Sequence, residues 1–437
     1  MQEALPARRS RPGRVFLGPL EIAGHYANLE AALRKHGVDA LAVDLFSHPF
    51  GYRQRAADPV PVRLARWART GRREATGSVS RVAWALPAVA LTVLLLAWAV
   101  IRFDTFVFGF RQSLLGLREL PLLRRLGKRV IFVFHGSDAR PPYIDGTQMA
   151  PDRAVSIEQC IAVTRRTKAD IRRIERYADA IVAQPAFCHF FERPVVSFFA
   201  LGVPWRDRPV AVEAASSTAG GTTRILHSPS DATVKGSARI REVVNELAAE
   251  GLPLELVELR GVPNDVVWRE LARCDFAIDQ IYSDAPMVGF ATEAAVAGKP
   301  SIVGGYAWPE NHRLFGSRPV PPVEECTPES LSDAVRRLAG DRDHRAQLGR
   351  QAQRWVLDTW SAPLIAERYI QVFERHPDAA WMFDPMDLRY VEGCGLSREE
   401  ARSLVRAMLA VGGTASLCVS DKPDLEAAFV AFAEEDS

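Results

Sequence analysis

The sequence predicts an α/β protein of two domains, each built on a parallel β-sheet. Short apolar segments alternate with amphipathic segments along most of the 437 residues, which is the pattern of repeated βαβ units. A polar stretch that becomes rich in small residues, 206–223, separates an earlier and a later run of this alternation. Residues 276–305 show one unit most clearly: an apolar strand, a glycine-containing loop, a helix that ends at Gly298 before Pro300, and a second strand.

The earlier run, residues 14–205, is expected to form the amino-terminal domain. Residues 1–13 lack the apolar segment of a signal peptide and are expected to be a disordered basic arm. Gly24 lies between the first strand and its helix, where a glycine admits close approach of a ligand, although one glycine is weak evidence. The expected strands are 14–18, 41–45, 105–108, 130–134, 180–183 and 194–199, and the main expected helices are 25–36, 114–126 and 155–178.

His135 follows the fully apolar strand 130–134 and precedes Gly136 and Asp138. Parallel sheets place their sites outside the carboxyl ends of their strands, so a histidine at this position is well placed for polar chemistry in a cleft. A turn residue with a satisfied imidazole is an equally good interpretation of these residues alone.

The amino-terminal part of the chain is basic. Residues 1–150 contain 22 Lys and Arg against 11 Asp and Glu, whereas the whole chain carries only +2. This bias favours an anionic partner, either a membrane surface or a phosphorylated substrate, and a nucleic-acid partner is not expected. Arginines alternate with apolar residues between 52 and 73, and residues 63–73 are expected to form a basic amphipathic helix.

An uncharged run of twenty residues, 82–101, follows this basic segment and is interrupted by Pro87. The run is long enough to span a bilayer. Strands before and after it are expected in one sheet, which argues against a span. Three interpretations stay open: a helix buried against the sheet, a helix that dips into a membrane surface, and a true span. We expect a cytoplasmic protein, peripheral at the inner membrane face if residues 52–101 bind an anionic surface.

The later run, residues 224–360, is expected to form the carboxyl-terminal domain. Its expected strands are 224–226, 254–259, 276–278 and 301–303, and its expected helices include 238–249 and 266–273. Lys235 and Gly236 precede the first of these helices, and an ammonium there can reach a diphosphate held at the helix start. Exposed lysines are common, so Lys235 alone is weak evidence.

The main expected site lies at the end of strand 276–278. Asp279, Gly289 and Glu293 fall there, outside the carboxyl end of the strand. Glu293 would lie in the first turns of the following helix, where free backbone amides favour a phosphate or sugar oxygen.

Residues 361–376 are expected to form a closing helix that packs back on the amino-terminal domain, and residues 377–437 a small α/β extension. Ser397 and Glu400 form a capping box ahead of one helix, residues 415–419 are expected to form a strand, and Pro423 opens the last helix.

Several classes of site are not expected. The six cysteines are far apart and form no CxxC pair, which is typical of a reduced cytosolic protein. The P-loop, HExxH, GxSxG and GxGxxG motifs do not occur. The only DxD, at Asp341 and Asp343, lies between helices and is interpreted as a solvated turn. Neither a metal nor a resident cofactor is expected.

Residues 289–305, GFATEAAVAGKPSIVGG, are similar to the signature of the family-4 (group 1) retaining glycosyltransferases. In that signature a GF turn precedes a glutamate, a small-residue helix, GKP and a strand. VKGS at 234–237 resembles the lysine-glycine pair of the family, and VFHGSD at 133–138 resembles its HG-D strand end. The similarity runs from about residue 14 to 374 and implies the GT-B fold, in which two Rossmann-like domains face a central cleft.

The resemblance also implies roles for individual residues. Glu293 would bind the ribose hydroxyls of a nucleotide-sugar donor, and Lys235 would neutralise its diphosphate in place of a metal. The other implied contacts are the backbone amides around Val288, Gly289 and Phe290 with the donor, Gly24 beside the diphosphate, and His135 as the catalytic residue facing the reacting sugar.

Two features depart from the family pattern. Ala285 replaces a glutamate that contacts the donor sugar, so the adjacent Asp284 is expected to take part in donor binding. Ser230 and Asp231 occupy the region of a diphosphate-binding arginine. The leading hypothesis is a metal-independent retaining hexosyltransferase with a carbohydrate or lipid-linked acceptor, as in polysaccharide biosynthesis. The alternatives are a GT-B nucleotide-sugar epimerase and a non-catalytic nucleotide-sugar or carbohydrate-binding protein.

Overall fold

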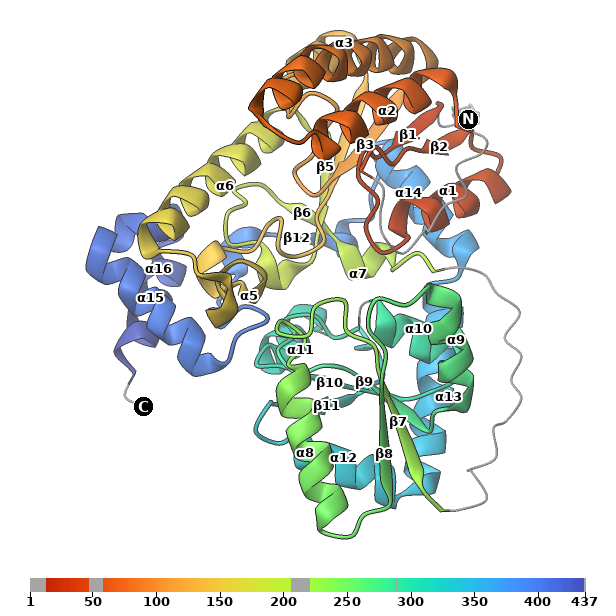
Figure 1. Cartoon of the computed structure of the whole chain (residues 1–437), viewed down its shortest axis with the longest axis vertical. Coiled ribbons are helices and arrows are strands. Elements are labelled where there is room, and N and C mark those ends of the chain that lie inside the picture. The colour runs from red at the N-terminus through yellow and green to blue at the C-terminus, as the bar shows by residue number, and fades with distance from the viewer. Residues whose placement is uncertain (1–12, 47–57, 206–220, 288, 317, 436–437) are drawn as a thin grey trace, which may run out of the picture.

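The structure is a computed structural model that describes residues 13–46, 58–205, 221–287, 289–316 and 318–435. The described residues form two α/β domains, one above the other in Figure 1, and a carboxyl-terminal extension beside the upper domain. Almost all of the expected basic arm, most of the expected linker, and Val288 lie outside the described residues.

The amino-terminal domain contains a seven-stranded sheet with the order β12-β6-β5-β4-β3-β1-β2. All neighbouring pairs are parallel except β12 with β6. The strands are β1 Val15–Leu17, β2 Ala40–Ala42, β3 Thr105–Gly109, β4 Arg129–Val133, β5 Ala180–Ala183, β6 Val195–Ser197 and β12 Met382–Phe383.

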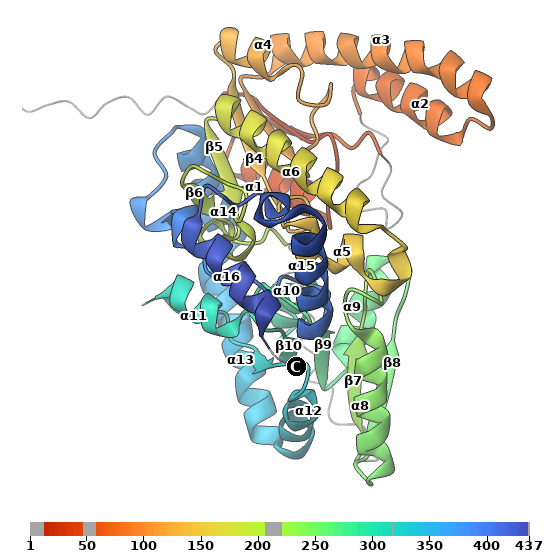
Figure 2. The ribbon, with the colours of Figure 1, turned by 90° about the vertical axis from the view of Figure 1, so that its left-hand side faces the viewer.

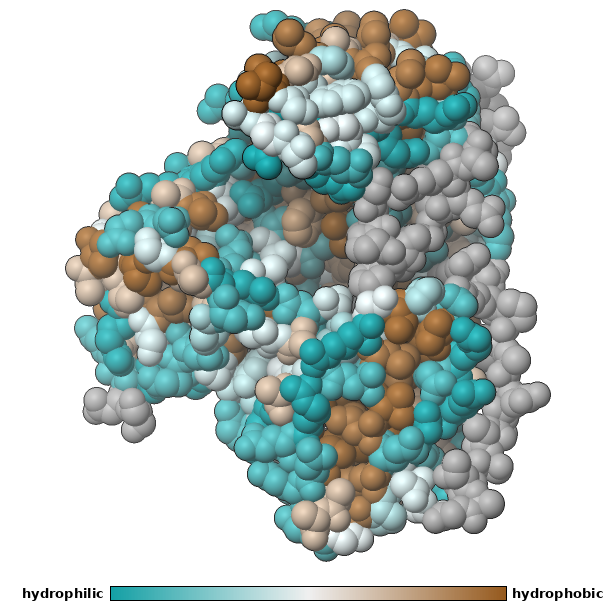
Figure 3. All heavy atoms as spheres, in the orientation of Figure 1, coloured by the Kyte–Doolittle hydropathy of each residue, from teal (hydrophilic) through white to brown (hydrophobic). Residues whose placement is uncertain are grey.

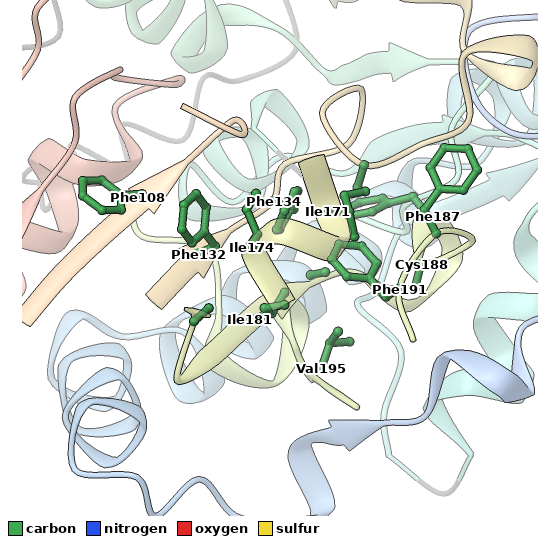
Figure 4. Close-up of a cluster of buried hydrophobic side chains, with 14 of the residues drawn as sticks. Phe108, Phe132, Phe134, Ile171, Ile174, Ile181, Phe187, Cys188, Phe191 and Val195 are labelled. Carbon is green, nitrogen blue, oxygen red and sulfur yellow. The ribbon is translucent and has the colours of Figure 1, made fainter. Parts of the chain in front are cut away.

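Helices cover both faces of this sheet because its strands are apolar on both sides. On one face, Phe108, Phe132 and Phe134 pack with Ile171 and Ile174 of α6, Ile157–Tyr177, as Figure 4 shows. The opposite face packs against α1, His25–Lys35, and α14, Ala362–Phe373. Shorter helices in this domain are α4 Leu120–Arg125, α5 Gly146–Met149 and α7 Phe198–Leu201.

Helices α2, Val60–Glu74, and α3, Ser78–Arg102, form an antiparallel hairpin between β2 and β3. By length and composition α3 could cross a membrane, and 28% of its apolar window is buried. Leu95, Leu96 and Ala99 pack on the sheet, whereas the opposite side of α3 is exposed. Because β1, which precedes α3, pairs with β3, which follows it, the two ends of the helix lie on the same side of any bilayer. Burial against the sheet therefore describes only one face of α3. A span of the bilayer by α3 conflicts with the pairing of β1 and β3, and contact with a membrane surface stays a prediction.

The carboxyl-terminal domain contains a five-stranded parallel sheet with the order β11-β10-β9-β7-β8. Its strands are β7 Thr223–His227, β8 Leu254–Glu258, β9 Phe276–Gln280, β10 Ser301–Gly304 and β11 Glu324–Cys326. The surrounding helices are α8 Ser237–Ala249, α9 Asn264–Arg273, α10 Phe290–Val296, α11 Trp308–Phe315, α12 Leu331–Gly340 and α13 Arg342–Thr359. The predicted GT-B fold, two Rossmann-like domains, is confirmed by this strand order and pairing.

The extension is mainly helical. It contains α15, Arg398–Gly412, with the expected capping box at Ser397, and α16, Pro423–Glu434. The prediction of a strand at 415–419 is wrong, because Thr414–Leu417 forms a 3₁₀ helix after α15. The two-residue β12 adds to the sheet of the amino-terminal domain instead.

A short segment of the extension touches both domains. Cys394 donates its amide to the Ile144 carbonyl in the amino-terminal domain over 3.0 Å, and Gly395 donates its amide to the Tyr282 carbonyl in the other domain over 2.8 Å. The closing helix α14 packs on α1, where the Tyr369 hydroxyl lies 3.2 Å from His25 Nε2.

Candidate functional site

A cleft of about 370 Å³ lies where the carboxyl ends of strands from both sheets face each other. The amino-terminal domain contributes the loop before α1, the end of β4 and the segment after β6, while the other domain contributes the loops after β7, β8 and β9. The lining residues are Ile22, Ala23, His25, His135, Phe198, Val203, Pro204, Ser228, Pro229, Ser230, Lys235, Leu259, Gly261, Val262, Asn264, Val267, Asp279, Gly289, Phe290 and Glu293.

Two histidines form the wall of the cleft on the amino-terminal side. His25 begins α1 and His135 follows β4, and their ring centroids are 4.8 Å apart. Gly24 precedes His25 as the N-cap of α1, with a φ of 79°, a left-handed conformation that favours glycine. It lies between two cleft-lining residues, Ala23 and His25, although it is not itself part of the lining.

His135 is held at the cleft in its neutral form. Burial lowers the pKa of its imidazole to about 4, so the ring is uncharged at neutral pH. Its Nε2 is buried and has no hydrogen-bond partner among the described residues. Asp138 stabilises the turn by accepting the backbone amides of His135 and Gly136 at 2.9 Å. Within the described part of the chain this nitrogen of the imidazole is therefore both unpartnered and closed to solvent, so the ring would have to turn to present it to a ligand.

Lys235 provides a cation on the opposite wall. Its Nζ lies 3.3 Å from Oδ1 of Asp279, whose side chain is buried at the end of β9. The second oxygen of that carboxylate, Oδ2, has no partner within the described part of the chain. This pairing holds the ammonium at the cleft. The other N–H groups of the ammonium can then donate hydrogen bonds to a ligand.

The chain turns sharply after Lys235 to begin α8. Gly236 is the N-cap of this helix with a φ of 74°, and a Cβ at this position would lie 2.3 Å from the side chain of Ile281. Glycine is therefore required by both backbone conformation and space. The tight turn places Lys235 close to the first amides of α8, of which that of Ser237 is already bonded to the Ala232 carbonyl over 2.9 Å.

Glu293 lies in the first turn of α10 and lines the cleft together with Gly289 and Phe290. Its Oε1 accepts a hydrogen bond of 2.8 Å from Nδ2 of Asn264, the first residue of α9. Pro263 is the N-cap of α9, and the side-chain amide of Asn264 orients the glutamate.

Asp284 does not lie where the resemblance implied. Its side chain is buried and accepts hydrogen bonds from Arg140 of the amino-terminal domain, with Oδ2 at 2.7 Å from Nε and 2.5 Å from Nη2. It is not among the residues that line the cleft. The structure therefore assigns Asp284 a contact between domains, since a guanidinium already occupies its carboxylate.

Ala285 is also turned away from the cleft. It is 6% exposed and belongs to an apolar cluster that includes Met287 and Ala291. The Ser283 hydroxyl fixes this loop by accepting the amide of Ala285 at 3.0 Å. In this conformation, position 285 is filled by packing and presents no group to a ligand.

Sequence reasoning left several lining residues out of the candidate site. His25 was recognisable from its place at a helix start, but a position alone did not distinguish it from ordinary polar residues. Asn264 and Phe198 come from segments distant in sequence from Glu293 and His135, so only the tertiary structure brings them together.

No group of three or more His, Cys, Asp or Glu side chains with metal-binding geometry occurs in the described ranges. Asp341 of the DxD sequence is the N-cap of α13 and accepts the amide of His344 at 2.9 Å. That contact agrees with its interpretation as a turn residue.

The sequence matches no protein-family model and none of the curated proteins. Among solved structures, similar folds occur in the glycotransferase of kitacinnamycin, with 16% identity, a TM-score of 0.43 and coverage of 83% of this chain and 100% of that one. HepE of Anabaena in complex with UDP-glucose is 13% identical, with a TM-score of 0.46 and coverage of 83% of this chain and 99% of that one. A protein of Listeria monocytogenes described as a UDP-N-acetylglucosamine 2-epimerase is 11% identical, with a TM-score of 0.42 and coverage of 84% of this chain and 97% of that one.

These likenesses carry no argument about chemistry, because the TM-scores are below 0.5 and the identities below 25%. The architecture rests on the chain's own two parallel sheets. By fold, this is a GT-B protein with a cleft between its two Rossmann-like domains.

Proposed function

We propose that this protein is a retaining glycosyltransferase that moves a sugar from a nucleotide-sugar donor to a carbohydrate or lipid-linked acceptor without a metal. The observation that carries the proposal is the meeting, in one cleft between the domains, of Lys235, Glu293 and the neutral His135. The cation suits a diphosphate, and the carboxylate can accept hydrogen bonds from the hydroxyls of a ribose. The uncharged ring can hydrogen-bond a sugar.

The carboxyl-terminal side of the cleft suits a nucleoside diphosphate. Leu259, Val262 and Val267 provide apolar surface for a base, and the Glu293 carboxylate beside them can accept hydrogen bonds from ribose hydroxyls. Lys235 also lines this side of the cleft, and α8 begins two residues after it, which favours a diphosphate there.

The proposed chemistry depends on stabilising the leaving group. When the bond from the sugar to the diphosphate breaks, negative charge grows on the departing phosphate oxygen. A fixed ammonium and oriented backbone amides stabilise that charge more than the charge of the bound donor, which accelerates the step. Lys235, anchored by Asp279, supplies the cation that a metal provides in other transferases.

His135 is proposed to act on the sugar. A neutral imidazole whose buried Nε2 has no partner among the described residues can, once the ring turns towards the cleft, exchange a hydrogen bond with a sugar hydroxyl and hold the anomeric carbon towards the acceptor. The retaining outcome rests on the resemblance of residues 289–305 and 234–237 to family-4 transferases.

Turnover measurements on a panel of nucleotide sugars, with simple sugars and lipid-linked sugars as acceptors, test this proposal. Transfer or donor hydrolysis with release of nucleoside diphosphate is expected from at least one donor, with the anomeric configuration kept. Inversion of configuration would refute the retaining assignment. Interconversion of one nucleotide sugar into its epimer would identify an epimerase.

A second candidate function is a non-catalytic nucleotide-sugar or carbohydrate-binding protein. The buried, apolar setting of Ala285 favours it, because the position that carries a sugar-binding glutamate in family-4 transferases presents no group to the cleft. Tight binding of a nucleotide sugar without turnover on any acceptor would establish this function.

A further inference from the structure

The hairpin of α2 and α3 presents a continuous apolar surface to solvent. Figure 2 shows the turn of the hairpin projecting beyond the rest of the domain, and Figure 3 shows hydrophobic residues gathered over α3. Along α3 the exposed apolar side chains recur at helical spacing, and α2 adds a second row. They are Val79, Val82, Leu86, Val89, Val93, Leu94 and Ile101 on α3, and Val60, Leu64 and Trp67 on α2.

The two rows are joined rather than scattered. The rings of Trp67 and Trp84 meet edge to face with centroids 4.9 Å apart, which connects the exposed row of α2 with α3. Leu86 is 80% exposed and Val82 70%, values that a helix packed in a protein core does not show. Contiguous apolar surface of this kind marks an interaction site.

A cavity of about 640 Å³ lies between this hairpin and the loop that follows β3. Its lining combines apolar side chains with polar and basic ones. The lining residues are Leu45, Phe46, Arg69, Thr70, Arg72, Arg73, Ala88, Val89, Thr92, Val93, Gln112, Ser113, Leu114, Leu115, Gly116 and Arg118. Val89 and Val93 belong both to the cavity and to the exposed row of α3, so the cavity opens onto the apolar surface.

Four arginines surround this cavity, and its described lining contains no Asp or Glu. Arg69 is held at the wall by a 2.7 Å hydrogen bond to the Leu114 carbonyl, and its guanidinium lies 5.3 Å from the centre of the Phe46 ring. Arg72 and Arg118 are exposed at the rim. The cavity therefore combines apolar walls with concentrated positive charge.

The loop that forms the floor of the cavity is held by its own hydrogen bonds. Ser113 Oγ accepts the amide of Leu117 at 2.6 Å, and the buried Glu119 accepts the amide of Leu115 at 2.9 Å. The floor begins directly after β3, and Leu45 on the opposite side follows β2. The cavity thus lies at the same edge of the sheet as the cleft.

We propose that the cavity binds the phosphate group of an anionic membrane lipid, with its acyl chain along Val89 and Val93 and with α3 lying on the bilayer surface. Arginines bind phosphate through several parallel hydrogen bonds, whereas the exposed apolar rows match the acyl region. The four arginines of the lining favour this occupant over an apolar protein surface, which would cover the apolar rows but bring no anion to the guanidinium groups. This lipid site is separate from the donor cleft and does not depend on sugar transfer.

Flotation of the full chain with vesicles tests the proposal. The protein is expected to bind phosphatidylcholine vesicles containing phosphatidylglycerol and not vesicles of phosphatidylcholine alone. The double variant Arg72→Glu, Arg118→Glu is expected to lower partitioning at least about tenfold, because each arginine near an anionic surface contributes appreciably to binding. Exposed arginines of α13 provide the matched control, Arg342→Glu with Arg350→Glu, which should bind as the wild type does.

A second double variant tests the role of the exposed apolar row of α3. Val82→Ser with Leu86→Ser keeps every arginine and changes only exposed side chains, so folding should be unaffected and lipid binding weakened. Circular dichroism melting checks the fold of all variants. Equal binding by the wild type and both double variants would overturn the proposal. Equal binding of the wild type to neutral and to anionic vesicles would also overturn it.

Glycerol 3-phosphate and inorganic phosphate distinguish a lipid site from a phosphate site. If either competes fully with vesicles at concentrations that leave ionic strength unchanged, the cavity binds free phosphate and the lipid assignment is wrong. Nucleotide-sugar binding measured on the same variants should be unchanged, so a failed lipid site and a failed donor site give different results.

Discussion

Arg140 and Asp284 form a buried ion pair between the two domains, with Nη2 and Oδ2 separated by 2.5 Å and both side chains at most 5% exposed. Asp145, also buried, lies 3.3 Å from the other terminal nitrogen of the same guanidinium. Buried charges persist only when they are paired, so this contact fixes how the domains meet. A residue predicted to bind donor is instead part of the interface between domains.

Removing one partner of this pair should destabilise the protein strongly. Arg140→Ala leaves the carboxylates of Asp284 and Asp145 buried without their cation, which is expected to cost about 3 to 5 kcal/mol in the free energy of unfolding. Urea denaturation measures the change. The triple variant Arg140→Met, Asp145→Asn, Asp284→Leu leaves neither of these carboxylates buried without a cation, so it should recover most of the loss and leave donor affinity unchanged. A loss of donor affinity in that stable triple variant would restore the role of Asp284 in donor binding.

Lys235→Ala should weaken binding of the donor. Loss of a charge-assisted hydrogen bond to a diphosphate is expected to cost about 1.5 to 3 kcal/mol, or roughly a tenfold to hundredfold rise in Kd. Calorimetric titration with the nucleotide sugar that binds, and with its nucleoside diphosphate, measures it. Arg239→Ala on the exposed face of α8, where the arginine pairs with Glu242, is the matched control. Unchanged Kd in Lys235→Ala would refute the placement of the diphosphate.

Glu293→Gln should selectively affect ribose recognition. Wild-type protein is expected to discriminate against 2′-deoxy and 3′-deoxy analogues of the bound nucleotide, because a carboxylate accepts hydrogen bonds from ribose hydroxyls. The variant should lose about 1 to 2 kcal/mol of that discrimination. A double-mutant cycle of enzyme and ligand measures the coupling, and a coupling energy of zero would show that Glu293 does not contact the ribose.

His135 should make folding sensitive to acid. Its pKa is lowered to about 4 in the folded protein, below the ordinary value of 6.5, so the unfolded chain binds the proton more readily. The stabilisation from the neutral ring is therefore complete above about pH 6.5 and is lost as the pH falls towards 4. We expect the stability advantage over His135→Gln to shrink by about 1 to 2 kcal/mol between about pH 7 and pH 5. Urea denaturation at both pH values measures it, and a constant difference would mean that His135 is solvated.

Phe429 should anchor the carboxyl-terminal extension. It is fully buried and packs edge to face on Tyr143, with centroids 5.4 Å apart. Phe429→Ala is expected to destabilise the protein by about 3 to 5 kcal/mol through the cavity that it leaves. Val411→Ala, at an exposed position of α15, is the control and should change stability little. If both variants melt alike, the extension is not part of the cooperative core.

Local patterns were sufficient to predict many elements. The capping box at Ser397, Pro423 at the start of α16, and Gly298 with Pro300 after α10 all act within a few residues, and each marks a helix boundary close to its place in the structure. The strand predicted at 415–419 failed because Cys418 adopts a left-handed conformation, which apolar composition does not reveal. The alternation of strands and helices likewise indicated two parallel sheets, since connections between parallel strands require intervening helices.

The sequence by itself determined most of the segments that form strands and helices and which polar residues fall at strand ends, because hydrophobic periodicity and capping are local. Only the tertiary structure decided how those residues are used. It set Lys235 beside Asp279, brought the Asn264 amide to Glu293, and paired Asp284 with Arg140. It also buried the Nε2 of His135 with no partner among the described residues. These contacts join residues that are distant in the chain, and the burial that fixes their charge states arises only when the domains pack together.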